Sequence, residues 1–104
     1  MNRNLNIVSI CKDPEIGAVM KRLLEQEEGW TCISCTCPES VSMLLEKNTQ
    51  IDAVLVGSGL SDEEEQNIQQ QVASLNSFIP IVHHYGGGSG LIWAEIKSAL
   101  GIKN

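Results

Sequence analysis

Basic residues are scarce in this sequence of 104 residues, which has seven lysines and arginines against 13 aspartates and glutamates and a formal net charge of −6. Binding to a nucleic-acid backbone needs clustered Lys and Arg, and here the basic residues are scattered. The sequence also lacks an apolar run near the ~20 residues that span a bilayer. Its first residues, MNRNLNIVSICKD, show no long h-region or small-residue cleavage site, so we expect no export. We therefore expect a cytoplasmic protein that binds neither nucleic acid nor membrane.

Linkers, internal repeats and low-complexity segments are absent as well. The composition, 42% hydrophobic and 19% charged, is ordinary for a globular protein. A chain of this length supplies one hydrophobic core. The sequence therefore predicts one α/β domain over residues 1–104.

Apolar runs and amphipathic segments alternate four times along the chain. The apolar runs at residues 5–11, 30–37, 51–57 and 78–85 are predicted to be strands, each followed by a helix. Regular alternation with short connections predicts a three-layer αβα fold of the flavodoxin type. Its parallel sheet should have about four strands in the order 2-1-3-4, with any ligand beyond their carboxyl ends.

Two helix starts carry capping signals. Asp13 is a suitable N-cap for the helix predicted at residues 14–29, and Ser61 and Glu64 have the spacing of a capping box. The apolar residues of the first helix fall on one stripe, which we expect to pack on the sheet: Ile16, Val19, Met20, Leu23 and Leu24.

Three of the four cysteines fall in the stretch CISCTC at residues 32–37. Cys32 and Cys35 have the spacing of a redox or zinc-binding CxxC motif. If residues 30–37 form a strand, however, an odd separation points the two side chains to opposite faces, which blocks a disulfide and shared metal ligation. We interpret them as small apolar packing residues and predict no metal site.

Several segments resemble the receiver domain of two-component response regulators. The resemblance is carried by DPEI after the first strand, MKRLLEQEEGW before the second, PESVSMLLEKNTQIDAVLVGSGLSD in the middle and IPIV in the fourth strand. Together they cover roughly residues 5–85. The resemblance implies a receiver-like sheet and a role in signalling.

The resemblance also shows which receiver residues are missing. The acidic pair that holds Mg²⁺ in the family is matched by Cys11 and Lys12, the phosphoacceptor aspartate by Gly57, and the Thr or Ser after the fourth strand by Tyr85. The fifth strand, with its lysine, has no counterpart. Phosphoryl transfer to aspartate needs a carboxylate nucleophile and a cation held by oxygen ligands. The sequence thus predicts a degenerate receiver, without cofactor, that acts as a non-catalytic interaction module with a regulatory role and is not phosphorylated on aspartate.

Cys11 supports an alternative function. A thiol at the end of a strand, near a helix N-terminus and beside Lys12, is in surroundings that lower a thiol pKa. The tail HHYGGGSGLIWAEIKSAL is loosely similar to the IIB component of sugar phosphotransferase systems, which would make Cys11 a phosphocysteine. That family has a loop of small and hydroxyl residues after its cysteine, whereas this chain has CKDPEIG.

A glycine-rich stretch follows the fourth predicted strand. Its backbone N–H groups and the helix start after it could bind a small anion; the candidate residues are Gly86, Gly87, Gly88, Ser89 and Gly90. The alternative is a connector, because GGGSG matches neither the Walker nor the dinucleotide-binding fingerprint. His83 and His84 lie at the same rim and alternate in direction, so only one can face the core; one that titrates near neutrality would make a pH-sensitive contact.

The fourth strand would form an edge of the sheet, because no fifth strand follows it. Unpaired edge groups invite strand addition, and few charges protect this edge. The last helix, residues 91–100, adds a wide apolar face. Either surface could form a homodimer, unless the glycine-rich loop and the helix fold back over the edge. The sequence identifies no other protein partner.

Overall fold

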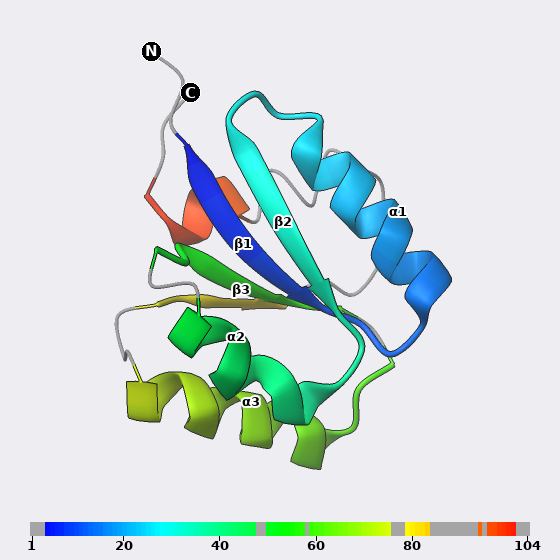
Figure 1. Cartoon of the computed structure of the whole chain (residues 1–104), viewed down its shortest axis with the longest axis vertical. Coiled ribbons are helices and arrows are strands. Elements are labelled where there is room, and N and C mark those ends of the chain that lie inside the picture. Colours follow the sequence, from blue (N-terminus) through cyan, green and yellow to red (C-terminus); the bar gives the residue numbers. More distant parts are fainter. Residues whose placement is uncertain are drawn as a thin grey trace.

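A parallel four-stranded sheet lies at the centre of the computed structural model, which describes residues 4–47, 50–57, 59–75, 79–83, 94 and 96–101. The strands are β1 (Leu5–Ile10), β2 (Trp30–Cys35), β3 (Ala53–Val56) and β4 (Ile81–His83). They lie in the order β2-β1-β3-β4 (Figure 1), which confirms the predicted order. Every residue of β3 is buried, as expected for a central parallel strand with both faces covered.

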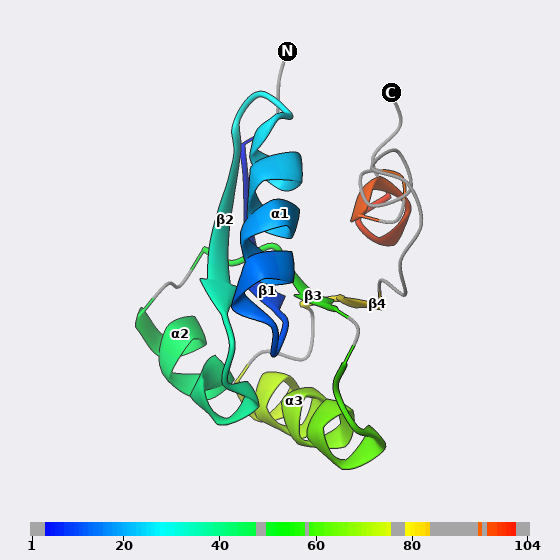
Figure 2. The same cartoon turned by 90° about the vertical axis from the view of Figure 1, so that its right-hand side faces the viewer.

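Helices cover both faces of the sheet. α1 (Pro14–Glu25) lies on one face together with the helical residues 94 and 96–99, whereas α2 (Val41–Lys47) and α3 (Asp62–Leu75) lie on the other (Figure 2). A short 3₁₀ helix at Pro38–Ser40 leads into α2. The predicted three-layer αβα fold is therefore confirmed. None of the helices that the structure describes is long and apolar enough to cross a membrane.

Each face of the sheet has its own apolar core. Ile7 and Leu55 belong to the core on the α1 side, whereas Val8, Val54 and Ile68 belong to the core on the side of α2 and α3. Successive residues of a strand point to opposite faces, so each central strand contributes to both cores. The continuous apolar runs in the sequence therefore provide side chains for both cores.

The ends of α1 are set by local signals. Asp13 caps the helix, with its carboxylate accepting a hydrogen bond of 2.9 Å from the backbone N–H of Glu15, and Pro14 is the first helical residue. The helix ends at Glu25, earlier than the predicted end at Gly29. Gly29 has a φ of 85°, so it shapes the turn into β2 rather than the end of the helix.

The predicted apolar stripe of α1 is only partly buried. Met20 is buried, but Ile16 and Val19 are 46% and 47% exposed. The cause is a close approach at Gly17, where an added side-chain carbon would lie 3.2 Å from Oγ of Ser34. Because the helix approaches the sheet through Gly17 and Met20, the neighbouring stripe positions turn towards solvent.

Candidate functional site

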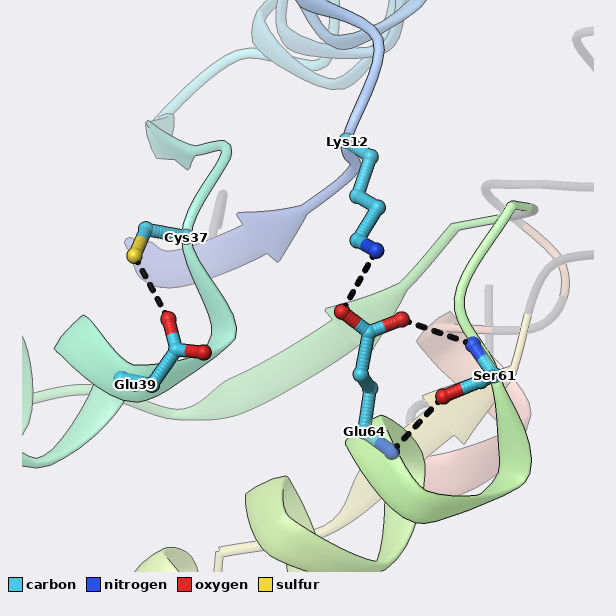
Figure 3. A network of polar contacts seen from close by, with 5 residues as sticks. All are labelled: Lys12, Cys37, Glu39, Ser61 and Glu64. Atoms are coloured by element: carbon cyan, nitrogen blue, oxygen red, sulfur yellow. Dashed lines mark hydrogen bonds and ion pairs between the residues drawn. The ribbon is translucent and has the colours of Figure 1, made fainter.

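The candidate site lies at the carboxyl ends of the parallel strands. Lys12 follows β1, Cys37 and Glu39 follow β2, and Ser61 and Glu64 follow β3 (Figure 3). β1 lies between β2 and β3, so the three connections meet at one edge of the sheet. This is the edge at which the sequence predicts ligand binding.

An ion pair joins two of these connections. Nζ of Lys12 lies 2.6 Å from Oε2 of Glu64, and the two side chains are 50% and 22% exposed. Glu64 also completes a capping box, because its Oε1 accepts from the N–H of Ser61 at 2.9 Å and its own N–H donates to Oγ of Ser61 at 3.2 Å. The predicted capping box is confirmed, and the ion pair of Glu64 with Lys12 joins the start of α3 to the loop after β1.

These contacts favour the ionised form of Glu64. The hydrogen bond from Lys12, followed by the one from the backbone of Ser61, holds the pKa of Glu64 below its ordinary value. The ionised form of Glu39 is favoured as well. The thiol of Cys37 donates a hydrogen bond of 2.7 Å to Oε2 of Glu39, which lowers the pKa of this carboxyl group. Lys12 lowers the pKa of Glu39 further, whereas the charge of Glu64 raises it. Lys12 thus balances part of the charge of two carboxylates.

Gly57 leaves little space for a side chain at the end of β3. Its N–H donates to the carbonyl oxygen of Ile10 at 2.8 Å. An added side-chain carbon would lie 3.2 Å from that oxygen and 3.3 Å from both Cβ of Cys11 and Cε of Met20. Ile10, Cys11 and Met20 would therefore have to shift slightly to admit a side chain at position 57.

Cys11 is a packed residue. Its side chain is 1% exposed and belongs to the core on the α1 side, together with Met20 and Leu55. Its backbone N–H donates to the carbonyl oxygen of Cys35 at 2.9 Å, which extends the pairing of β1 and β2. This burial favours packing over a role as an accessible nucleophile.

Cys32 and Cys35 have the surroundings of protonated thiols. Cys32 and Cys35 belong to the cores on opposite faces of the sheet, which confirms the prediction made for this CxxC spacing. Burial raises the pKa of Cys32 to about 11 and raises that of Cys35 as well. Within the described part of the chain no disulfide is formed and no three His, Cys, Asp or Glu side chains are grouped to hold a metal ion.

His83 is the other predicted rim residue that the structure describes. Its Nε2 lies 2.9 Å from Oε1 of Glu65, so the end of β4 is joined to α3. His84 and Tyr85 lie outside the described residues, as does the candidate anion-binding loop of Gly86, Gly87, Gly88, Ser89 and Gly90. The roles assigned to these residues stay predictions.

Sequence reasoning missed the partners of Lys12. Glu64 was recognised only as a helix cap, and Glu39 was not singled out. A usable signal was present, because the connections after three adjacent parallel strands meet at one edge of the sheet. A lysine after β1 and glutamates in the first turns after β2 and β3 should therefore be neighbours.

Acidification should destabilise the fold through Glu39 and Glu64. Both pKa values are lowered, so each carboxylate binds a proton less tightly in the folded chain than in the unfolded one. Their contribution to stability is complete above the ordinary value of 4.5 and is lost as the pH falls through the lowered folded values. Urea unfolding over a pH series should show this loss.

A matched pair of variants isolates the part due to Glu64. Glu64→Gln removes one carboxylate with a lowered pKa, so the stability of this variant should decline less steeply with acidification than that of the wild type. Glu28→Gln changes an exposed glutamate in the turn before β2 and should decline like the wild type. Equal slopes for the two variants would exclude a linkage through Glu64.

Comparison with known proteins identifies neighbours by structure rather than by sequence. No protein-family model matches the chain, and no curated protein is significantly similar in sequence. A response regulator receiver domain protein from Clostridium thermocellum matches with a TM-score of 0.77 at 12% identity, over 93% of this chain and 94% of that one. A receiver protein from Burkholderia phymatum matches with a TM-score of 0.71 at 15% identity, over 96% and 98%.

A third neighbour is an atypical orphan response regulator. It matches with a TM-score of 0.51 at 17% identity, over 92% of this chain and 95% of that one. Its structure is described as revealing a phosphorylation-independent regulatory mechanism. At such identities the likeness shows the fold, and it confirms the receiver-like architecture indicated by the sequence segments.

Proposed function

We propose that this chain, which has the receiver fold, is a single-domain, non-catalytic signalling module that regulates a protein partner without phosphorylation on aspartate. The observation that carries the proposal is the ion pair of 2.6 Å between Lys12 and Glu64, together with the close surroundings of Gly57. Together they occupy the edge at which a receiver-like phosphorylation site would be built.

The chemistry of this edge supports the proposal. An aspartyl phosphate needs a carboxylate nucleophile, and Gly57 has no side chain. A divalent cation needs several oxygen ligands, whereas Lys12 places an ammonium group among the nearby carboxylates. To bind Glu64, Mg²⁺ would have to displace the ammonium group of Lys12. The displaced ammonium group would stay close by and repel the cation. We infer that the site does not bind Mg²⁺.

The ion pair also has a consequence for regulation. It joins the loop after β1 to the start of α3 without a metal ion or a phosphoryl group. We infer that a partner recognises the arrangement of these two connections directly. The phosphorylation-independent mechanism described for the atypical orphan regulator is a precedent within the same fold.

The phosphocysteine alternative gains no support from the surroundings of Cys11. The side chain is 1% exposed, so a phosphoryl donor would need to reach a buried thiol. The homodimer predicted through the edge of β4 or the last helix, and the anion site at residues 86–90, stay secondary proposals.

A titration with MgCl₂ followed by NMR tests the proposal. We expect the amide signals of Lys12, Gly57 and Glu64 to move no more than those of exposed acidic residues far from this edge, because only nonspecific charge screening remains. A receiver domain that retains its aspartates is the positive control. A saturable shift confined to these three amides would overturn the proposal.

A further inference from the structure

β2 is an edge strand that its own side chains leave almost unprotected. Residues 30–37, WTCISCTC, contain no charged residue and no proline. They include aromatic and β-branched residues, which favour strands. Natural edge strands are usually protected from strand addition by charges, prolines or bulges. The neutral sequence of β2 therefore raises the question of what protects its outer edge.

Two side chains of α1 bind the backbone of this edge at its centre. The N–H of Cys32 donates to Oε2 of Glu25 at 3.0 Å, and Nζ of Lys21 donates to the carbonyl oxygen of Cys32 at 2.6 Å. Lys21 and Glu25 are also paired with each other at 3.1 Å, one helical turn apart. We call these two side chains the α1 clasp.

The α1 clasp stands in the place of a neighbouring strand. It supplies one acceptor and one donor to the two backbone groups of Cys32, which is what an adjacent strand would supply. The hydrogen bond from the backbone of Cys32, followed by the one from Lys21, lowers the pKa of Glu25. The carboxylate is therefore ionised at neutral pH and accepts both hydrogen bonds strongly.

The geometry of the strand indicates how the edge would pair if it were released. The backbone groups of alternate residues point to the same side of a parallel strand, so those of Ser34 point outward like those of Cys32. Thr31 and Ser34 are exposed. A second copy of β2 lying antiparallel meets an identical set of donors and acceptors, as a twofold interface requires. No like charges within the two strands would oppose it, although the whole chain carries a net charge of −6.

We propose that the α1 clasp blocks strand addition at the outer edge of β2, and that its removal lets two copies of this chain pair through β2. The inference is independent of the function proposed above. It concerns the β2 edge of the sheet. The dimer surface predicted from the sequence is at the other edge, β4.

The test compares two double variants of α1. Lys21→Ala with Glu25→Ala removes the clasp, whereas Glu15→Ala with Arg22→Ala removes one acid and one base from exposed positions of the same helix. Both leave the net charge unchanged. Sedimentation velocity over a concentration series should show at least tenfold stronger self-association for the clasp variant than for the wild type, and no change for the control. Far-UV circular dichroism establishes that each variant is folded.

Amide hydrogen exchange locates the new contact. The amide of Cys32 should be protected at every concentration in the wild type. In the clasp variant its protection should rise with protein concentration, because only a second copy then accepts its hydrogen bond. Adding Thr31→Lys to the clasp variant places a charge on the strand and should abolish the self-association.

Two results would overturn the inference. One is a folded clasp variant that associates no more than the wild type and keeps an unprotected Cys32 amide at all concentrations. The other is self-association that the control variant shows equally, or that Thr31→Lys does not reverse.

Discussion

Replacing Gly57 with aspartate should lower the free energy of unfolding by about 3 kcal/mol or more, and it should not create a phosphorylation site. The first side-chain carbon alone would lie 3.2 Å from the carbonyl oxygen of Ile10 and 3.3 Å from side-chain atoms of Cys11 and Met20. These neighbours would therefore have to move to admit the larger, charged side chain. A reduced entropy of the unfolded chain offsets only about 0.4–1 kcal/mol of this cost. Urea unfolding measures the change.

Two further variants divide this effect into its causes. Gly57→Ala adds only the close contacts, and we expect a net loss of about 1 kcal/mol. Gly59→Asp adds the same carboxylate in the same loop, where no atom lies within 4 Å of the added carbon but φ is 93°. Its cost should be the backbone strain alone, about 1–2 kcal/mol. A Gly57→Asp variant as stable as the wild type would show that position 57 is open.

Replacing Gln71 with alanine should destabilise the fold by about 2–3 kcal/mol, because a whole set of hydrogen bonds is lost. Oε1 of Gln71 in α3 accepts from the N–H of Ser42 at 2.7 Å and from its hydroxyl at 2.8 Å. Nε2 donates to the carbonyl oxygen of Pro38 at 2.8 Å and also to Oδ1 of Asn67. One side chain thus satisfies a backbone group of the 3₁₀ helix and one at the start of α2.

The reason for this dependence is the length of α2. A helix of seven residues is not stable alone, so it needs packing and capping from its neighbours. Hydrogen exchange should be faster throughout α2 in the Gln71→Ala variant, and urea unfolding should give the loss of stability. Gln70→Ala is the matched control, since Gln70 is exposed on the same helix and alanine favours helices. Equal stability of the two variants would exclude a capping role for Gln71.

Signals that act within a few residues predicted the structure best. The cap of α1 by Asp13 and the capping box of Ser61 and Glu64 could be predicted, because each contact joins residues two or three apart in the sequence. Continuous apolar runs identified the four strands, and their alternation with helices gave the sheet order. The sequence was wrong about which residues of α1 pack on the sheet. Ile16 and Val19 are exposed because Gly17 brings another side of the helix onto the sheet, a tertiary contact that helical periodicity does not contain.

The candidate site was predicted only in part for a similar reason. The sequence placed a positive charge at Lys12 and an empty position at Gly57, but it assigned Glu64 to capping alone. A carboxylate has two oxygens, and here Oε1 caps the helix while Oε2 binds Lys12. The approach of Cys11 to position 57 depends on the pairing of β1 with β3, and that of Met20 depends on how α1 packs, so both appear only in the fold.

Incubation of the wild-type chain with acetyl phosphate and Mg²⁺, followed by intact-mass spectrometry, is the most direct test of the claim that this sheet edge has no phosphorylation site. A receiver domain that retains its aspartates shows that the donor is active, and Gly57→Asp shows whether a carboxylate alone restores the reaction. We expect the wild-type chain and the variant to keep their unmodified masses. A phosphoryl adduct on the wild-type chain that hydroxylamine releases, as it releases an acyl phosphate, would contradict the claim.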